Sequence, residues 1–245
     1  MPPCQGLLGY SCISMAYNMT MRRRFHVLLA AAGALALLGC SSSNETKTAS
    51  KKEETPATAP AATAPKKEQA PDVFKVNLDT SKGPVVLEIH RDWAPVGVDH
   101  FYGLVKTGFY DGARFFRVVR GFVVQFGING NPDTNRLWSN MNLPDDPVKE
   151  HNVMGTITYA TAGPNTRSTQ LFINLTNNSR LDRDGFAPFG KVVSGMAAVE
   201  AFYGGYGDMP PGGEGPDPSQ IEAQGYDYLL NHFPRLDFVK KATIE

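Results

Sequence analysis

Cysteine is absent from the sequence after residue 40, because the three cysteines are Cys4, Cys12 and Cys40. The long remainder of the chain therefore offers no disulfide and no thiol nucleophile. An excess of charge of one sign is also absent: Lys and Arg total 24, Asp and Glu total 24, and the formal net charge is zero. Without a basic excess, nothing in the composition favours nucleic acid as a partner. We expect neither thiol chemistry nor nucleic-acid binding.

Residue patterns for metal binding and hydrolysis are lacking as well. The histidines are scattered, and no two have the helical spacing of metal ligands. No Ser-centred nucleophile elbow is present, and Ser168 has no base close to it in sequence. Asp145 and Asp146 are adjacent carboxylates, but prolines flank them and predict a solvated turn instead of an acid–base pair. The sequence predicts no metal site and no hydrolase.

Glycine and proline, by contrast, are abundant, with 24 and 18 of the 245 residues. This composition favours a turn-rich β protein with long loops, and the length allows one or two domains. Internal repeats and long helical periodicity are missing from the sequence, which argues against a structural scaffold of the cell envelope.

The chain begins with segments that have the pattern of targeting sequences. Residues 1–18 match neither a signal peptide nor the start of a domain, and we expect a misassigned extension with the true start at Met19 or Met21. Residues 19–39 are typical of a lipoprotein signal peptide. Three arginines precede an apolar stretch at 27–38, which is too short to span a bilayer comfortably.

The end of the apolar stretch, Leu37-Leu38-Gly39-Cys40, resembles the bacterial lipobox. That resemblance implies cleavage before Cys40, lipidation of Cys40, and, with Ser41 following, release to the periplasmic face of the outer membrane. The alternative is a plain secretory signal in which Cys40 is incidental. Residues 40–71 contain almost no large apolar side chain, so we expect a disordered tether that holds the domain on the order of 30 Å from the membrane.

Residues 72–245 have the pattern of one folded domain. Short stretches rich in Val, Phe and Ile predict strands, and apolar residues at helical spacing predict two helices. The expected strands are 74–79, 85–90, 114–119, 122–127, 154–160, 171–175, 189–193 and 236–244. The expected helices run from Pro95 to just before Gly108 and over 196–203, with loops at 128–152, 181–188 and 204–218 and room for a short helix within 220–231.

Residues 114–127 form the central motif of this domain. Two runs rich in Phe and Val flank an Arg-Gly break, which predicts two strands joined by a tight turn. Side-chain alternation then places Arg117 on one face with Phe115, and Val123 on one face with Gln125. A guanidinium, an amide and apolar groups thus lie close together. The plain alternative is an ordinary strand pair with one solvated arginine.

The same motif resembles the cyclophilin signature, in which Phe-x-Arg and a hydrophobic pair precede Gly-Phe-x-x-Gln-x-Gly. Residues 160–173 and 189–196 resemble two further blocks of that family, in the expected order. The resemblance covers about 73–245 and implies a mainly β fold, a closed eight-stranded antiparallel barrel capped by two helices. The number of short strands and helices agrees with such an architecture.

The resemblance also implies roles for single residues. Arg117 matches the catalytic arginine, and Gln125 matches the amide that contacts the substrate backbone. The proline pocket corresponds to Phe122, Val123, Phe172 and Leu181. The adjoining groove, which receives the residues before the proline, corresponds to Ala160, Thr161 and Gln170.

Two positions depart from the family pattern. Arg180 and Leu181 stand where well-known relatives carry Trp, a position that contributes to cyclosporin binding, so drug sensitivity does not follow from the resemblance. Phe186 stands where relatives carry His, which keeps the apolar wall and removes a polar contact.

The resemblance implies a peptidyl-prolyl cis-trans isomerase that assists the folding of extracytoplasmic proteins. Such an enzyme needs no cofactor, because rotation about an X–Pro bond requires only a donor aimed at the proline nitrogen and an apolar seat for the ring. Its partners are proline-containing polypeptides and, through Cys40, a membrane, and we expect a monomer. The alternative function is a proline-segment binding or chaperone module with little catalytic activity.

Overall fold

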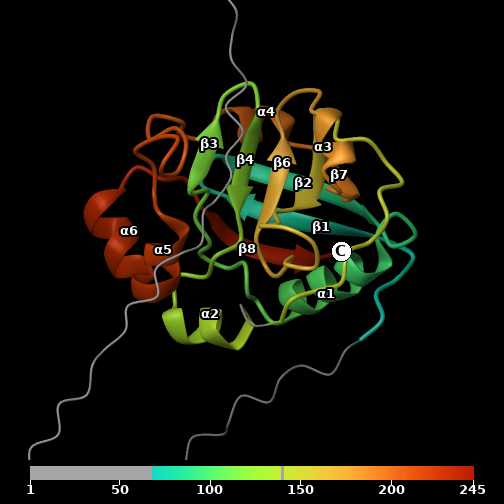
Figure 1. Ribbon diagram of the computed structural model, residues 1–245. Coiled ribbons are helices and arrows are strands. Elements are labelled where there is room, and N and C mark those ends of the chain that lie inside the picture. The colour runs from blue at the N-terminus through green and yellow to red at the C-terminus, as the bar shows by residue number, and fades with distance from the viewer. Residues whose placement is uncertain (1–67, 139–140) are drawn as a thin grey trace, which may run out of the picture. The chain divides into compact units, whose positions relative to one another are not determined.

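The computed structural model describes residues 68–138 and 141–245 (Figure 1). The expected extension at 1–18, the signal peptide at 19–39, Cys40 and the tether up to residue 67 lie outside the described residues. The described residues begin slightly before the predicted boundary at residue 72. Ala70 is buried, and its N–H donates a 2.9 Å hydrogen bond to Asp99 Oδ1.

Eight strands form one antiparallel sheet in the order β3-β4-β6-β5-β7-β2-β1-β8. Each strand predicted from the sequence is present, within a few residues of its expected bounds. The strands are β1 Val73–Thr80, β2 Gly83–His90, β3 Arg117–Val119, β4 Val123–Phe126, β5 Thr156–Tyr159, β6 Leu171–Asn174, β7 Pro188–Ser194 and β8 Val239–Ile244.

The β1–β2 hairpin illustrates why these segments become strands. Along β1, Phe74, Val76 and Leu78 are buried while the residues between them face outward or lie half-buried, as the alternation of a strand with one core face requires. Thr80 pairs with Gly83, so the turn contains two residues. Gly83 has a φ of 115°, which a side chain would strain.

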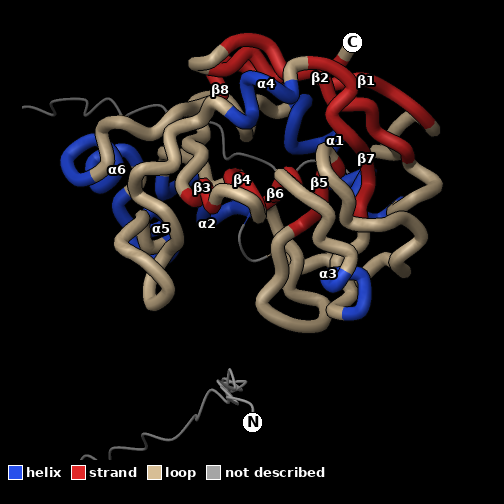
Figure 2. Tube along the Cα trace, turned by 90° about the horizontal axis from the view of Figure 1, so that it is seen from above, coloured by secondary structure: helices blue, strands red, loops and turns tan. Residues whose placement is uncertain are grey.

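The sheet curls into an open half-barrel, with β3 and β8 as its edge strands. Figure 2 shows β8, β1, β2 and β7 on one side and β3, β4, β6 and β5 on the other. The closed barrel expected from the resemblance is not confirmed, because β3 and β8 share no ladder in the described sheet. The segment before β3 makes the contact instead: Phe115 N donates to Asp237 O at 2.9 Å, and Val239 N donates to Ala113 O at 2.9 Å.

The first strand of the central motif is shorter than predicted, and packing gives the reason. Phe115 and Val118 both enter the main core, although side chains three positions apart on an uninterrupted strand face opposite sides. Phe116 packs into a second apolar cluster. The chain is therefore irregular at 115–116, and the expectation that Phe115 shares a face with Arg117 was wrong.

Helices cover the ends and one side of the sheet (Figure 1). Helix α1, Pro95–Lys106, matches its prediction, with Pro95 in its first turn and Val98, Phe101, Leu104 and Val105 buried. Helix α4, Met196–Glu200, is shorter than the predicted 196–203. The remaining helices are α2 Pro132–Trp138, α3 Arg180–Arg183, α5 Pro218–Gln224 and α6 Tyr226–His232.

Helices α2 and α3 occupy segments predicted to be loops, and two helices replace the single short one expected within 220–231. Gly225 separates α5 from α6 with a φ of 59°, which breaks the helical path. The two-helix cap of the prediction is thus too simple for the described domain.

Asp146 corrects another prediction. It is buried, and its carboxylate accepts hydrogen bonds from Val96 N at 3.0 Å and Gly97 N at 2.8 Å, in the first turn of α1. Arg167, also buried, pairs with it at 3.1 Å. Asp145 is exposed, as a solvated turn requires, but Asp146 caps a helix whose own N-cap residue, Ala94, has no side-chain acceptor.

The second apolar cluster attaches residues 204–236 to the sheet. Phe116 and Ile128 pack there against side chains of the C-terminal segment. These partners are Ile221, Leu229 and Leu236, with Tyr206, Tyr228 and Phe233 at the edge. Residues 204–236, of which 204–218 were predicted to be a loop, are therefore held against the domain by several side chains.

Leu229 tests how much this cluster stabilises the domain. Leu229→Ala should lower the free energy of unfolding by about 2–4 kcal/mol, because its side chain is 2% exposed and the substitution leaves a cavity. Leu230, on the same helix, is 52% exposed, so Leu230→Ala should change stability by less than about 0.5 kcal/mol. Urea unfolding measures both. Equal losses would show that α6 contributes nothing through burial.

Candidate functional site

The β3–β4 hairpin brings Arg117 opposite Gln125, since the two residues pair in the register of the strands. Gly121, with a φ of 69°, forms the turn between them. Arg117 Nη1 donates a 3.0 Å hydrogen bond to Gln125 Oε1. The side chain of Arg117 is only 18% exposed, so its charge lies at the rim of the domain's interior and not in open solvent.

Arg117 and Gln125 face a small cavity of about 120 Å³ that is otherwise mostly apolar. Val123, Phe172 and Leu181 form its buried floor, and the rings of Phe172 and Phe186 meet edge-on at 5.7 Å. The cavity is lined by Arg117, Phe122, Val123, Gln125, Ala160, Thr161, Phe172, Leu181, Phe186 and Met209.

Helix α3 carries Leu181 into this cavity, and Asp182 anchors the helix. The Asp182 carboxylate accepts hydrogen bonds from Asn152 N at 2.9 Å and Asn152 Nδ2 at 2.8 Å. His151 Nδ1 lies 2.9 Å from its second oxygen. Burial raises the pKa of Asp182, but these hydrogen bonds outweigh burial and hold the pKa below its ordinary value.

Phe122 contacts two guanidinium groups and lines the cavity. The Arg117 guanidinium carbon is 5.5 Å from the ring centroid, and that of Arg180 is 5.1 Å from it. Cation–π contacts of this kind fix a half-exposed ring in place. Arg180, at the position where the family pattern has Trp, therefore supports the pocket wall by stacking.

A second cavity of about 230 Å³ adjoins the first and is more polar. Gln125, Ala160, Thr161 and Met209 line both cavities. Gln170 lines only the second, where its Oε1 accepts a 3.0 Å hydrogen bond from Gln125 Nε2. All the residues predicted for the pocket and groove are thus brought together in two connected cavities.

The polar side chains form one continuous hydrogen-bonded row. Asp208 lies at one end, where its Oδ1 is 2.6 Å from Arg117 Nε and its Oδ2 is 3.3 Å from Arg117 Nη2. Arg117, Gln125 and Gln170 follow, and Gln170 Nε2 donates to Glu222 Oε1 at 3.4 Å. Two carboxylates from the C-terminal segment therefore end the row.

The two carboxylates differ in protonation behaviour. Burial raises the pKa of Asp208, but the hydrogen bond and charge of Arg117, with the Met209 N–H, outweigh burial and hold it below its ordinary value. Burial raises the pKa of Glu222, and the hydrogen bond from Gln170 only partly opposes this effect.

Sequence reasoning missed Asp208, Met209 and Glu222. Asp208 and Arg117 are 91 positions apart, and no spacing rule connects a glycine-rich stretch to a strand so distant. The only local signal was an acidic residue and a large apolar residue side by side within a segment of glycines and prolines.

A third cavity, of about 470 Å³, lies beyond Thr161 and Phe186, which line it together with Asp145, Asp146 and Arg183. Its buried carboxylate, Asp146, is engaged by α1 and Arg167. In the described part of the chain, no three His, Cys, Asp or Glu side chains meet as a metal site would require. Nor does any described helix have the length and hydropathy to cross a bilayer.

The family model and two similar curated proteins agree on one family. The model of the family "Cyclophilin type peptidyl-prolyl cis-trans isomerase/CLD" matches residues 75–214. Peptidyl-prolyl cis-trans isomerase ppi1 of Schizosaccharomyces pombe is 37% identical over 131 residues, 51% of this chain and 82% of that protein. Peptidyl-prolyl cis-trans isomerase A of Dickeya dadantii is 39% identical over 133 residues, 51% of this chain and 68% of that protein.

A solved structure agrees on the fold. The crystal structure of a Cryptosporidium parvum cyclophilin type peptidyl-prolyl cis-trans isomerase matches with a TM-score of 0.51 at 20% identity. The match covers 71% of this chain and 98% of that chain. The family match ends at residue 214, before α5, α6 and β8.

Asp182 gives a pH-dependent test of the anchoring of α3. Asp182→Asn should destabilise the domain by about 1–2 kcal/mol at neutral pH, because a charged acceptor of two Asn152 donors becomes neutral. Since the folded pKa is lowered, this contribution is present above the unfolded pKa of about 3.9 and is lost as pH falls through the folded value.

The difference in unfolding free energy between wild type and Asp182→Asn, measured in urea, should therefore shrink from pH 7 to pH 3. Asp184→Asn changes an exposed carboxylate of the same turn and serves as the control. A difference that stays constant over this range would contradict the anchoring role of the ionised carboxylate.

Proposed function

The chain belongs to the cyclophilin-type peptidyl-prolyl cis-trans isomerases, and from this premise we propose that it accelerates X–Pro isomerisation in extracytoplasmic polypeptides at the cavity containing Arg117. The observation that carries this proposal is a guanidinium held in a fixed orientation at the rim of an otherwise apolar pocket. No cofactor takes part in the proposed reaction.

The reaction demands little covalent chemistry. The X–Pro bond has partial double-bond character, with a rotational barrier of about 18–20 kcal/mol, and the uncatalysed exchange takes tens to hundreds of seconds. Halfway through the rotation, resonance is lost and the proline nitrogen carries a lone pair. A donor already aimed at that nitrogen stabilises the twisted state more than either planar state, which is the condition for catalysis.

Arg117 has the donors for this role. Its Nε–H and one N–H of each terminal nitrogen are engaged by Asp208 and Gln125 among the described residues, so each terminal nitrogen keeps one further N–H. A guanidinium stays charged at all physiological pH values, and its planar shape keeps the donor directions fixed.

The other cavity residues have complementary roles in the proposal. Phe122, Val123, Phe172, Leu181 and Phe186 enclose the proline ring, because an apolar cavity of this size favours a small ring over water. Gln125, whose side chain is buried and hydrogen-bonded at both ends, contacts the peptide backbone. Ala160, Thr161 and Gln170 line the groove for the residues that precede the proline.

The cellular setting is part of the proposal. The positive residues 22–24, the apolar stretch 27–38 and the lipobox-like end at Cys40 support a lipid anchor, and the tether after Cys40 leaves the domain free to reach client proteins. The enzyme then acts in the cell envelope, at the periplasmic face of the outer membrane. It acts as a monomer, because one domain buries its own core.

Substitution of Arg117 tests the catalytic role. Arg117→Ala should lower kcat/KM on an Ala-Pro peptide by about 10²–10³-fold, the loss typical of one transition-state donor. Arg117→Lys should restore only part of the rate, since an ammonium cannot hold the Asp208 and Gln125 contacts together. A protease-coupled isomerisation assay measures both.

Arg136→Ala removes an exposed arginine of α2 and is the control, with circular dichroism to verify folding. An Arg117→Ala variant as fast as wild type would remove Arg117 from the mechanism. Peptide binding without any acceleration by folded wild-type protein would favour the proline-segment binding module instead.

Cysteine substitution tests the anchor. In a Gram-negative host supplied with labelled palmitate, wild type should carry the label and sediment with the outer membrane, because several acyl chains anchor stably. Cys40→Ala should lose the label and appear in the soluble periplasmic fraction, and Cys12→Ala should behave as wild type. Label retained by Cys40→Ala would exclude this lipidation site.

A further inference from the structure

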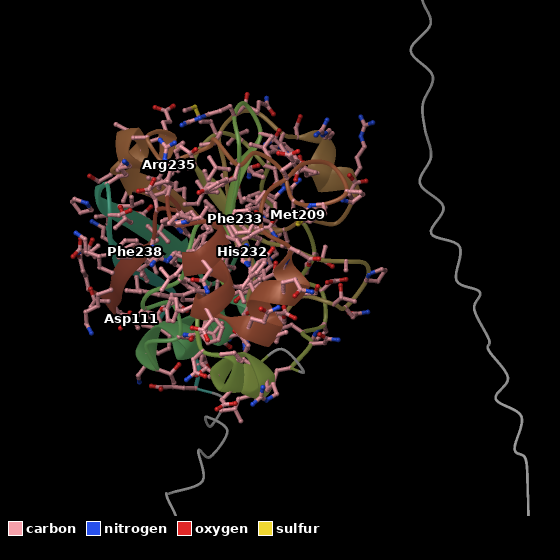
Figure 3. The ribbon with its side chains drawn as sticks, turned by 90° about the vertical axis from the view of Figure 1, so that its left-hand side faces the viewer. Asp111, Met209, His232, Phe233, Arg235 and Phe238 are labelled. Atoms are coloured by element: carbon pink, nitrogen blue, oxygen red, sulfur yellow. The ribbon has the colours of Figure 1, made fainter. Side chains whose placement is uncertain are left out.

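Residues 204–217, the glycine- and proline-rich stretch between α4 and α5, contribute side chains to both cavities of the site. Asp208 pairs with Arg117, and Met209 lines the pocket and the groove. Met209 and Phe233 lie on the face of the molecule that Figure 3 presents, where the C-terminal segment covers the sheet.

Asp208 holds the guanidinium on the edge opposite Gln125. Its two oxygens engage Nε and Nη2, while Gln125 accepts from Nη1. Contacts on both edges restrict the guanidinium plane to one orientation. An arginine side chain with a single contact can still adopt several rotamers. The orientation of the Arg117 guanidinium at the cavity is therefore set by Asp208 and Gln125 together.

Asp208 is itself held firmly by the backbone around it. Its Oδ1 accepts a 2.8 Å hydrogen bond from Met209 N, and its backbone carbonyl accepts one of 2.8 Å from Gly215 N. A Cβ at Gly213 would lie 2.4 Å from that carbonyl oxygen, and a Cβ at Gly215 would lie 2.8 Å from it. The glycines of this stretch are thus required for the close chain path that presents Asp208.

Both ends of residues 204–217 are attached to the domain. Gly204 packs against the β3–β4 hairpin, where a Cβ would meet Arg120 Nε at 3.2 Å, and Arg120 Nη2 donates to Phe202 O at 2.8 Å. Tyr206 meets the ring of Phe233 edge-on at 5.0 Å. At the far end, Asp217 caps α5 by accepting from Ser219 N at 2.8 Å. A segment fixed at several points can hold a side chain at the accuracy that catalysis requires.

Met209 occupies the boundary between the apolar pocket and the polar groove. A proline in the pocket places the preceding side chain along the groove, beside Met209. The thioether side chain is flexible and apolar, so it favours an apolar neighbour of limited size. Glu222, at the far end of the hydrogen-bonded row, places a carboxyl group near the groove, which in its ionised form disfavours an acidic neighbour.

We propose that Asp208 is a positioning residue for Arg117 and that Met209 determines which residue the enzyme accepts before the proline. The proposal rests on isomerase activity at the Arg117 cavity. It adds Asp208 and Met209 to the active site, with apolar residues of moderate size preferred before the proline and acidic residues disfavoured.

The test for Asp208 combines kinetics with a direct view of Arg117. Asp208→Asn should lower kcat by about tenfold with KM nearly unchanged, as expected for a misaligned donor. The Arg117 Nε–H signal in nitrogen-15 spectra should exchange slowly with water in wild type and be broadened in Asp208→Asn. Glu214→Gln, which removes an exposed charge from the same stretch, is the matched control.

Equal kinetics and equal Nε–H exchange in Asp208→Asn and Glu214→Gln would overturn the positioning role. A rise in KM with kcat unchanged would also overturn it, because that result assigns Asp208 to substrate binding. The Nε–H measurement does not depend on turnover, so it decides the role of Asp208 even if the wild-type protein fails to accelerate isomerisation.

The test for Met209 uses peptides that differ only before the proline, with Ala, Leu, Phe or Glu at that position. Met209→Ala should raise kcat/KM for the Phe-Pro peptide relative to the Ala-Pro peptide by about tenfold, because the smaller side chain leaves more space in the groove. Wild type should act least on Glu-Pro. Asp208→Asn should leave the ratio of kcat/KM for the Phe-Pro and Ala-Pro peptides as in wild type.

A Met209→Ala variant with the wild-type ratio would overturn the specificity role. Affinities of the same peptides, measured by calorimetry, give the ratio independently of turnover. If the proposed function is wrong, the protein should bind the peptides without accelerating their isomerisation. If this inference is wrong, Met209→Ala should leave the ratio of the affinities for the Phe-Pro and Ala-Pro peptides unchanged.

Discussion

The half-buried charge of Arg117 is the constraint on which the rest of the site depends. Removing a guanidinium from open water is costly unless its hydrogen bonds are replaced, and here Asp208 and Gln125 replace three of them. The guanidinium also lines a mostly apolar pocket, where an electrostatic contact is stronger than in water. The contacts that neutralise the charge of Arg117 therefore also fix its orientation, as the proposed reaction requires.

The C-terminal segment is the structural consequence of this arrangement. Asp208 reaches Arg117 only because residues 204–236 pack against the sheet through the cluster of Phe116, Ile128 and Leu229. Glu222 lies on α5 and accepts the hydrogen bond from Gln170. Stability and function are thus linked: the apolar contacts that hold α5 and α6 also fix the two carboxylates that end the polar row.

Local patterns were sufficient for much of the fold. Alternation along β1 and the helical spacing of α1 were read correctly, because each depends on residues close in sequence. The sequence also predicted that Arg117 and Gln125 lie close together, since a tight turn fixes the register of the two strands that carry them. Patterns failed where tertiary contacts decide: Asp146 turned out to be buried under α1, and the strand before Arg117 is interrupted because Phe115 and Val118 both enter the core.

By itself the sequence determined the family and the succession of strands along the chain, because these follow from local periodicity and from motifs read in order. The resemblance to the family supplied the pocket residues except Met209, which lies in a distant glycine-rich stretch. Only the tertiary structure decided which segments meet at the open edges of the sheet and what holds Arg117. Those features depend on contacts between segments far apart in the chain, such as residues 113–115 with 237–239 and Arg117 with Asp208. Such contacts are selected by packing of the whole domain, and no short stretch of sequence encodes them.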